Sequence, residues 1–234
     1  MSEAGLEFST PSSVVGPRQS PLIKVCGLTS RDEALASVAA GADWIGLNFH
    51  PASPRWIDPQ TAAAIIAALP PPAQAVGLFV DCLPEEVATQ ADRLGLRIVQ
   101  LHGHEPPEDL VAQRHLHVVR AFRLADAATI AEMRAYLRRA AELGRPPDAV
   151  LVDAHVAGQP GGTGRTIEPD LLDRLPPLPR LVLAGGLTPE NVAGRVARVR
   201  PWMVDVASGV EAAPGRKDPG RVAAFVRAAR TARP

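Results

Sequence analysis

The sequence predicts an α/β fold in which eight parallel strands close into a (β/α)8 barrel. Short apolar runs alternate with helical patterns along the chain, eight such runs occur, and the chain has 234 residues. This length suits one barrel of about 250 residues better than two ordinary domains. We therefore assign residues 21–234 to a single barrel domain. Residues 1–20, rich in Ser, Pro and Gly, are expected to form a flexible leader.

The eight apolar runs are bounded by Gly, Pro, Asp or Ser and are often β-branched, as is typical of strands. They are Leu22–Cys26, Trp44–Phe49, Ala75–Val80, Arg97–Leu101, His117–Phe122, Ala149–Asp153, Leu181–Ala184 and Met203–Val206. Helix starts are expected between them. Ser30 with Glu33 has the pattern of a capping box. Asp58-Pro59, Thr188-Pro189 and Asp218-Pro219 each offer an N-cap followed by proline.

Strands that alternate with helices predict a parallel sheet, because each crossover returns the chain in the same direction. Eight strands also suffice to close a barrel whose interior side chains fill. The alternative fold is an open, doubly wound sheet, which usually carries a Gly-rich turn after its first strand. Here Lys24-Val25-Cys26-Gly27 stands at that place and no GxGxxG pattern occurs, so the barrel is favoured.

Composition excludes several classes of function. The chain is 46% hydrophobic and 21% charged, with a formal net charge of zero, so neither nucleic acid nor an anionic membrane is expected as a partner. Two cysteines without metal-ligand spacing indicate a reducing, cytoplasmic setting. No run approaches the ~20 apolar residues of a membrane span, and the first residues lack the pattern of a secretory signal.

Functional groups of a barrel gather where its strands end. Cys26 ends the first run and Asp153 ends the sixth. Side chains alternate along a strand, so Lys24 and Cys26 lie on the same face of the first strand. Leu151 and Asp153 likewise lie on the same face of the sixth strand. If the apolar residues between them face the helices, a thiol and a carboxyl group meet at one mouth of the barrel. Such a pair can act as a base and an acid when the surroundings tune their pKa values.

Glycine turns follow three consecutive strands. Gly162, Thr163 and Gly164 follow the sixth, Gly185 and Gly186 the seventh, and Ser208 and Gly209 the eighth. Backbone N–H groups in such turns can converge on one anion, and a phosphate site after strands seven and eight recurs in barrels. The arrangement favours a phosphate site over the alternative that these glycines serve only to form turns.

Three more side chains are candidates for substrate binding. Arg55 lies in Ser53-Pro54-Arg55 after the second strand, where it either binds a carboxylate or remains a surface arginine. Gln100 and His102, at the end of the fourth strand, either bind a substrate or satisfy polar groups at the strand end. The histidines form no convincing metal spacing, so no metal is expected.

Seven segments together resemble the phosphoribosylanthranilate isomerase family of tryptophan biosynthesis. They are Ile23–Leu28, Ser53–Arg55, Val99–Gly103, Leu151–Asp153, Gly161–Gly164, Leu183–Leu187 and Val204–Val206 with Ser208–Glu211. The resemblance spans residues 22 to 230, and the order of these motifs is specific. Two stretches depart from the family pattern: residues 165–169, and Ala207 where a polar residue is common.

The resemblance implies an Amadori rearrangement of N-(5-phosphoribosyl)anthranilate to 1-(o-carboxyphenylamino)-1-deoxyribulose 5-phosphate. It implies that Asp153 protonates the furanose oxygen and that Cys26 then removes the C2′ proton. Arg55 is implied to bind the anthranilate carboxylate, and the glycine loops the phosphate. No metal or organic cofactor is implied, and family members are monomers or homodimers.

Three other functions compete with this one. A histidine-pathway aminoaldose isomerase performs the same chemistry on a bis-phosphate, but Cys26 and the lack of a Gly-rich turn after His102 favour a monophosphate substrate. A catalytically silent phosphosugar-binding barrel is disfavoured by the intact Cys26 and Asp153. Metal-dependent epimerisation of a sugar phosphate is the third alternative.

Overall fold

The computed structural model describes residues 20–154, 167–178 and 180–232, which form the predicted closed barrel. Each strand is parallel to the next, and β8 pairs with β1 to close the ring. The strands are β1 (Leu22–Cys26), β2 (Trp44–Asn48), β3 (Gln74–Phe79), β4 (Ile98–Leu101), β5 (His117–Leu124), β6 (Ala149–Ala154), β7 (Leu181–Leu183) and β8 (Met203–Val206). All eight expected strands are confirmed, within two residues at each end. The predicted leader lies outside the described residues except for Ser20.

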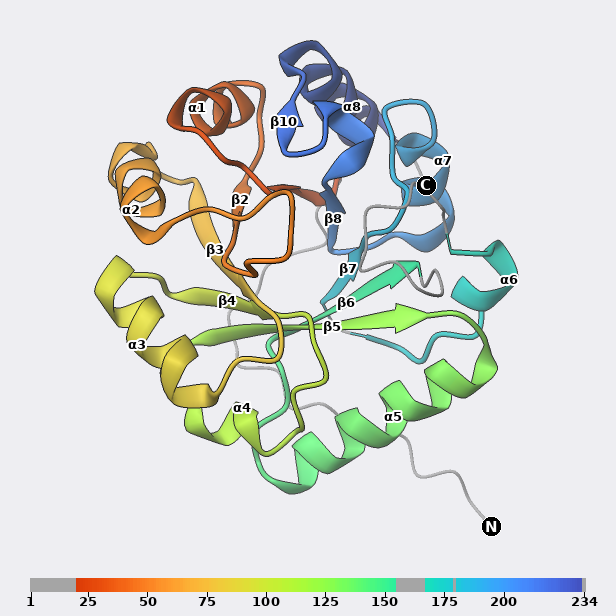
Figure 1. The fold of residues 1–234 in the computed structure, drawn as a ribbon. Helices are drawn as coiled ribbons and strands as arrows, with labels where there is room; N and C mark the ends of the chain where they lie inside the picture. The colour runs from red at the N-terminus through yellow and green to blue at the C-terminus, as the bar shows by residue number, and fades with distance from the viewer. Residues whose placement is uncertain (1–19, 155–166, 179, 233–234) are drawn as a thin grey trace.

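The helices lie around the outside of the strands (Figure 1). They are α1 (Arg31–Ala39), α2 (Pro59–Ala68), α3 (Pro84–Leu94), α4 (Asp109–Ala112), α5 (Ala127–Glu142), α6 (Pro169–Leu172), α7 (Val192–Val199) and α8 (Pro219–Thr231). Within the described ranges, none of these helices is both long and apolar enough to cross a membrane.

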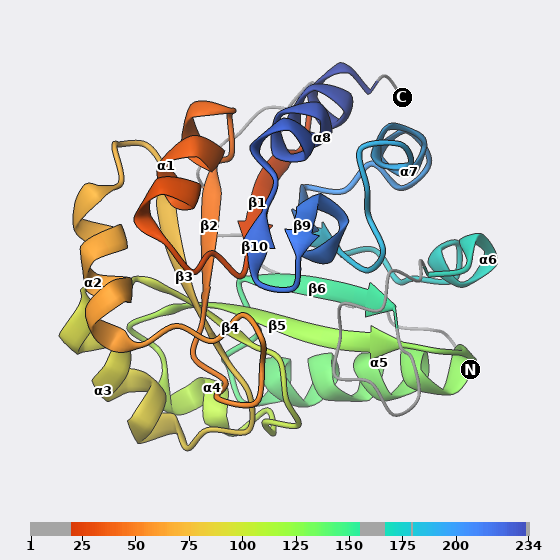
Figure 2. The same ribbon diagram turned by 45° about the horizontal axis from the view of Figure 1, so that its top comes forward.

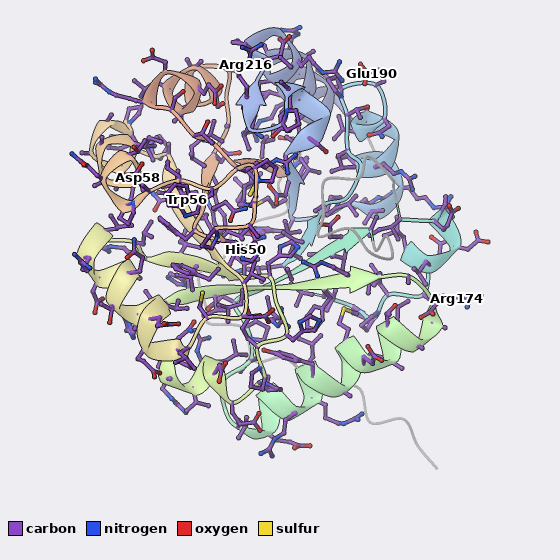
Figure 3. All side chains as sticks on the ribbon, in the orientation of Figure 1. His50, Trp56, Asp58, Arg174, Glu190 and Arg216 are labelled. Atoms are coloured by element: carbon purple, nitrogen blue, oxygen red, sulfur yellow. The ribbon has the colours of Figure 1, made fainter. Side chains whose placement is uncertain are left out.

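Two of the expected helix starts are confirmed. Asp58 lies at the start of α2 (Figure 3), and its carboxylate accepts hydrogen bonds from the N–H groups of Gln60 and Thr61. Asp218 accepts from the N–H of Arg221 at the start of α8. These carboxylates satisfy N–H groups that have no partner within the helix, and Pro at the first helical position loses no hydrogen bond.

The other two expected starts are realised differently. Ser30 caps α1 by accepting from Glu33 N–H at 3.3 Å, but the Glu33 carboxylate accepts from the backbone N–H of Lys217 instead of completing the box. The expected helix start at Thr188-Pro189 was wrong, because α7 begins at Val192. A turn fills the gap, and the Asn191 side chain closes it by accepting from Thr188 N–H at 2.9 Å.

The core has an inner and an outer layer. Inside the barrel, alternate strand residues pack on one another, among them Leu22, Val76, Leu151 and Met203. Their neighbours along each strand point outward and pack against the helices, as Ile23 does. This alternation confirms the expected facing of β1 and β6 and directs Lys24, Cys26 and Asp153 to the inside.

A small hairpin stands between β8 and α8. It follows the short 3-10 helix η1 (Ser208–Val210) and consists of β9 (Glu211–Ala213) and β10 (Arg216–Lys217) (Figure 2). The hairpin rests on the loop after β1, because the Thr29 hydroxyl donates to Gly215 O at 2.9 Å. It also contacts the loop after β2, since a Cβ added to Gly215 would stand 2.5 Å from Pro54 O. The hairpin thus joins loops that are distant in sequence.

The inner layer makes a testable contribution to stability. Leu151 is 0% exposed, whereas Leu83 at the start of α3 is 58% exposed. Leu151→Ala is expected to lower the free energy of unfolding by about 2–5 kcal/mol, because it removes buried methyl groups and leaves a cavity. Leu83→Ala is expected to change it by less than about 0.5 kcal/mol. Equal losses for the two variants in urea denaturation would contradict the packing described.

Candidate active site

A buried ion pair inside the barrel joins the neighbouring strands β1 and β8. The Lys24 ammonium donates to Asp205 Oδ2 at 2.9 Å, and both side chains are almost completely shielded from solvent. Lys24 and Asp205 are also partners in the register of the two strands. Burial disfavours the charged form of Lys24, but the neighbouring carboxylate outweighs this effect and the pKa of Lys24 lies above its ordinary value.

The Cys26 thiol lies two residues beyond Lys24 on the same face of β1 and is buried. Burial raises the pKa of the Cys26 thiol, whereas the positive charges of Lys24 and Lys217 work against the rise. Gly46 of β2 lies beside the sulfur, where an added Cβ would stand 2.6 Å from Cys26 Sγ. The absence of a side chain at position 46 therefore makes room for the thiol.

The Asp153 carboxyl group lies near the end of β6 and is largely buried. Burial raises the pKa of Asp153 to about 6, the charge of Asp205 adds to the rise, and the cations Arg123 and Lys24 oppose it. With that pKa, about one molecule in ten still carries the proton at pH 7. Asp153 can therefore donate a proton under physiological conditions. The ion pair of Lys24 and Asp205 perturbs both this carboxyl group and the thiol of β1.

His102 connects β4 to Asp153. Its Nε2 atom lies 3.7 Å from Asp153 Oδ2, and its Nδ1 atom lies 2.8 Å from Gln100 Nε2. Burial and the nearby charges of Arg123 and Lys24 lower the pKa of His102 to about 3, so the ring is neutral and its contact with Asp153 is not an ion pair. The structure thus brings together three residues that the sequence singled out: Gln100, His102 and Asp153.

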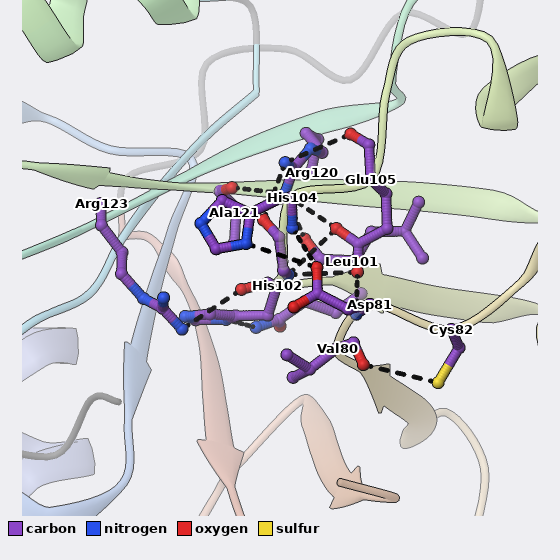
Figure 4. A network of polar contacts seen from close by, with 12 residues as sticks. Val80, Asp81, Cys82, Leu101, His102, His104, Glu105, Arg120, Ala121 and Arg123 are labelled. Carbon is purple, nitrogen blue, oxygen red and sulfur yellow. Dashed lines mark hydrogen bonds and ion pairs between the residues drawn. The ribbon is translucent and has the colours of Figure 1, made fainter. Parts of the chain in front are cut away.

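A polar network behind His102 holds the loop that follows β4 (Figure 4). The buried Glu105 carboxylate accepts from the backbone N–H groups of Asp81 and Gly103. Arg120 lies 3.3 Å from the same carboxylate and donates to the carbonyl oxygens of Leu101 and Gly103. These contacts tie the segments that follow β3 and β4 to the middle of β5 and fix the backbone on either side of His102.

Arg55 extends from the loop between β2 and α2 and forms a two-pronged ion pair. Its Nε and Nη2 atoms donate to the two oxygens of Glu211 at 2.7 and 2.8 Å. Glu211 also accepts from Lys217 Nζ at 2.6 Å. Burial works against the negative charge of Glu211, but the two cations outweigh it and hold the pKa of Glu211 below its ordinary value.

Two of the three glycine turns are described. Gly185 and Gly186 have φ angles of 83° and 60°, a left-handed conformation that favours glycine. A Cβ added to Gly185 would stand 2.7 Å from Asp153 Oδ1, so this turn lies directly against the carboxyl group. Ser208 and Gly209 begin η1, and Gly209 packs against the Leu187 carbonyl. The third turn, with Gly162, Thr163 and Gly164, lies outside the described residues.

Comparison with known proteins decides the family. A model of the N-(5'phosphoribosyl)anthranilate (PRA) isomerase family matches residues 23–228, which is most of the chain. The chain belongs to the PRA isomerase family. An N-(5'-phosphoribosyl)anthranilate isomerase of Geobacter sulfurreducens is 47% identical over 210 residues, covering 89% of this chain and 98% of the relative. One of Pseudomonas fluorescens is 44% identical and covers 88% and 94%.

Solved structures of PRA isomerases share the barrel. The enzyme of Thermotoga maritima superimposes with a TM-score of 0.79 at 36% identity, covering 89% of this chain and 98% of the other. A PRA isomerase in complex with reduced 1-(o-carboxyphenylamino)-1-deoxyribulose 5-phosphate has a TM-score of 0.75 at 35% identity, with the same coverage. The resemblance inferred from the motifs and the single-domain barrel are thereby confirmed.

The sequence did not single out Asp205, Glu211 and Lys217 as members of the site. Asp205 could have been found, because it holds the same inward register in β8 as Lys24 does in β1. Glu211 and Lys217 belong to the small hairpin, and no periodic pattern marks where that hairpin folds back. Among the described residues, no group of His, Cys, Asp and Glu side chains is arranged to hold a metal ion.

The ion pair of Lys24 and Asp205 can be tested by removing one or both charges. Lys24→Met is expected to lower the free energy of unfolding by about 3–5 kcal/mol, because it leaves a carboxylate buried without a cation. Lys24→Met combined with Asp205→Asn is expected to recover most of that loss. Denaturant titration of the two single variants and the double variant measures the coupling. Losses that simply add would contradict a direct interaction.

Proposed function

We propose that this chain catalyses the Amadori rearrangement of N-(5'-phosphoribosyl)anthranilate in tryptophan biosynthesis. Membership of the family supports the reaction. The observation that carries the assignment of roles is the buried Asp153, whose pKa is raised to about 6, on the same barrel interior as the Cys26 thiol. The reaction needs a general acid and a general base, and these two groups supply them.

Asp153 acts first, as the general acid. Its proton passes to the furanose ring oxygen as the bond between that oxygen and C1′ breaks. The lone pair of the anthranilate nitrogen forms a double bond to C1′, which gives an iminium ion. Burial suits Asp153 to this step, because it keeps a carboxyl group protonated at a pH at which an exposed Asp is ionised.

Cys26 acts second, as the general base. Its thiolate removes the C2′ proton, and the electrons of that bond form the C1′–C2′ double bond of an enolamine while the iminium nitrogen becomes neutral. The enolamine then tautomerises to the ketone product. The raised pKa of Cys26 keeps the free thiol protonated, and the positive iminium joins Lys24 and Lys217 in favouring the thiolate.

The other candidate residues bind the substrate in this proposal. Arg55 takes the anthranilate carboxylate, and His102, held by Gln100, donates a hydrogen bond from its neutral ring. The phosphate binds at Gly162, Thr163 and Gly164, together with the turns after β7 and β8. Support for the phosphate site comes from the backbone N–H groups of Gly185, Gly186, Ser208 and Gly209, which donate to no other described residue.

We further propose a cytoplasmic location, which suits a small-molecule biosynthetic enzyme whose two cysteines are both free. The chain acts as a monomer or a homodimer in this proposal. The substrate is a small molecule, and neither nucleic acid nor a membrane takes part.

Single substitutions test the assigned roles. Cys26→Ser and Asp153→Asn are each expected to lower kcat by about 10²–10⁴-fold, because each removes the group that moves a proton. The loss of anthranilate-adduct fluorescence on addition of purified protein measures turnover. Cys82→Ser and Asp92→Asn are matched controls and are expected to retain activity. Wild-type turnover by either active-site variant would overturn the role given to that residue, and an inactive wild type would overturn the function.

Complementation distinguishes the two amino-acid pathways. The gene is expected to restore growth to a tryptophan auxotroph that lacks PRA isomerase and not to a strain that lacks the histidine-pathway isomerase. Rescue of the histidine strain alone would contradict the proposal.

Full activity after exhaustive chelation is the expected result for the purified protein, and a loss would favour metal-dependent epimerisation.

The pKa values predict the shape of the pH profile. The active form needs Asp153 protonated and Cys26 ionised, yet the pKa of Asp153, about 6, lies below that of Cys26, which is raised from 9.0. Between these two pKa values, a rise in pH lowers the fraction of protonated Asp153 by the same factor as it raises the fraction of ionised Cys26. The value of kcat/KM is therefore expected to be level in this range. Below about pH 6 it is expected to fall tenfold per pH unit, because Asp153 is already protonated and only the thiolate fraction changes. An acid limb centred near pH 4 would contradict the burial of Asp153.

A further inference from the structure

The pair of Arg55 and Glu211 leaves one edge of the guanidinium without a partner. Glu211 occupies the edge formed by Nε and Nη2, at 2.7 and 2.8 Å. The adjacent edge, formed by Nη1 and the second N–H of Nη2, makes no hydrogen bond to another described residue. A guanidinium can bind two carboxylates side by side, one on each of these edges. Arg55 is therefore half occupied in a fixed orientation.

The stem of Arg55 is held beside the thiol. It lies across the backbone of Gly27, where an added Cβ would stand 2.5 Å from Arg55 Cδ. Gly27 directly follows Cys26 and has a φ angle of 77°, so a side chain there would be both strained and in the way. The charge of the Cys26 thiolate also acts on Arg55. The guanidinium is therefore placed at the end of the barrel that holds the base.

Glu211 is itself anchored. Lys217 Nζ donates to Glu211 Oε1 at 2.6 Å and to Ala207 O at 3.2 Å, and the backbone N–H of Lys217 donates to Glu33. The Glu211 and Lys217 side chains are 5% and 1% exposed. A buried carboxylate held by an anchored lysine loses little further freedom when it orients Arg55.

The ionised side chains around Arg55 carry charges of both signs. Arg55, Lys24 and Lys217 are positive, Asp205 and Glu211 are negative, and Cys26 is neutral as a thiol. Glu33, which accepts from the backbone N–H of Lys217, adds a third negative charge, so three positive and three negative charges balance. An anion that binds Arg55 is therefore held by the free edge of the guanidinium and not by an excess of positive charge around it.

We propose that Glu211 is a positioning residue that determines specificity for the carboxylate of the substrate. By occupying one edge of Arg55, it presents the other edge, formed by Nη1 and Nη2, to the ortho-carboxylate of the anthranilate ring. Glu211 does not touch the substrate itself. This inference rests on the role of Arg55 in the proposed function.

Ligand binding tests the inference separately from turnover. Calorimetry would compare reduced 1-(o-carboxyphenylamino)-1-deoxyribulose 5-phosphate with its phenylamino counterpart, which lacks the carboxylate. The ratio of the two dissociation constants measures the preference for the carboxylate. Glu211→Gln is expected to reduce this preference about tenfold. Without the charged carboxylate that orients it, Arg55 loses one well-oriented charged hydrogen-bond pair to the carboxylate of the ligand. Binding of the phenylamino ligand is expected to change less than about twofold.

Matched variants isolate the orientation of Arg55. Glu132→Gln on the exposed face of α5 is the control for the substitution and is expected to leave both constants unchanged. Arg55→Met is expected to abolish the preference for the carboxylate. Combining Arg55→Met with Glu211→Gln is expected to change the ratio of the two dissociation constants no further. Glu211→Asp retains the charge but withdraws the carboxylate by one methylene. It is expected to reduce the preference as well, which provides the readout if Glu211→Gln does not fold.

Charge neutralisation alone would give the opposite result. Removal of a negative charge would then tighten binding of the carboxylate ligand, and such an outcome in Glu211→Gln would overturn the inference. An unchanged preference in folded Glu211→Asp would overturn it too. Failure of the proposed function would look different: the wild type would bind both ligands without turning over the substrate, and the effect of Glu211 on the ratio would still be measured.

Discussion

The ion pair of Lys24 and Asp205 is the interaction on which the site depends. It joins the first and last strands of the barrel inside the closed sheet, at 2.9 Å and almost without solvent. Burial of two charges is costly, and their attraction repays the cost only when the geometry is good. Burial is the largest cause of the raised pKa values of the proposed base and acid, and the charges of Lys24 and Asp205 act on both groups.

The residues of the site lie on two kinds of segment, strands and loops. Strands fix Cys26, Gln100 and Asp153 through their inward register, with side chains that have little freedom. Loops supply Arg55 and His102, together with the glycine turns after β7 and β8, and polar contacts hold the loops of Arg55 and His102 in place. The contacts of Glu105 with Arg120 hold the loop after β4, and the hairpin with Glu211 and Lys217 holds Arg55. The proposed base and acid lie on strands inside the barrel, as the proposed substrate ligand Gln100 does, whereas Arg55 extends from a loop.

Much of the fold could be predicted from the sequence, because short apolar runs and their alternation depend on neighbours along the chain. The inward facing of Cys26 and Asp153 followed from that alternation. The start of α7 could not be predicted, because the Asn191 side chain closes a turn that Thr188-Pro189 alone does not specify. The partner of Arg55 was also inaccessible, since Glu211 is 156 residues away and reaches it only through the folded hairpin. Local patterns carry no record of such distant contacts.

Gly46 has a consequence for how this barrel can change over generations. The space that a side chain would fill at position 46 is taken by the sulfur of Cys26. The two positions therefore form one packing unit shared by adjacent strands, although only one of them carries a reactive group. A larger residue at 46 is tolerable only with a smaller or redirected residue at 26. We therefore expect the two positions to co-vary among descendants of this sequence, with glycine inherited wherever the thiol is kept.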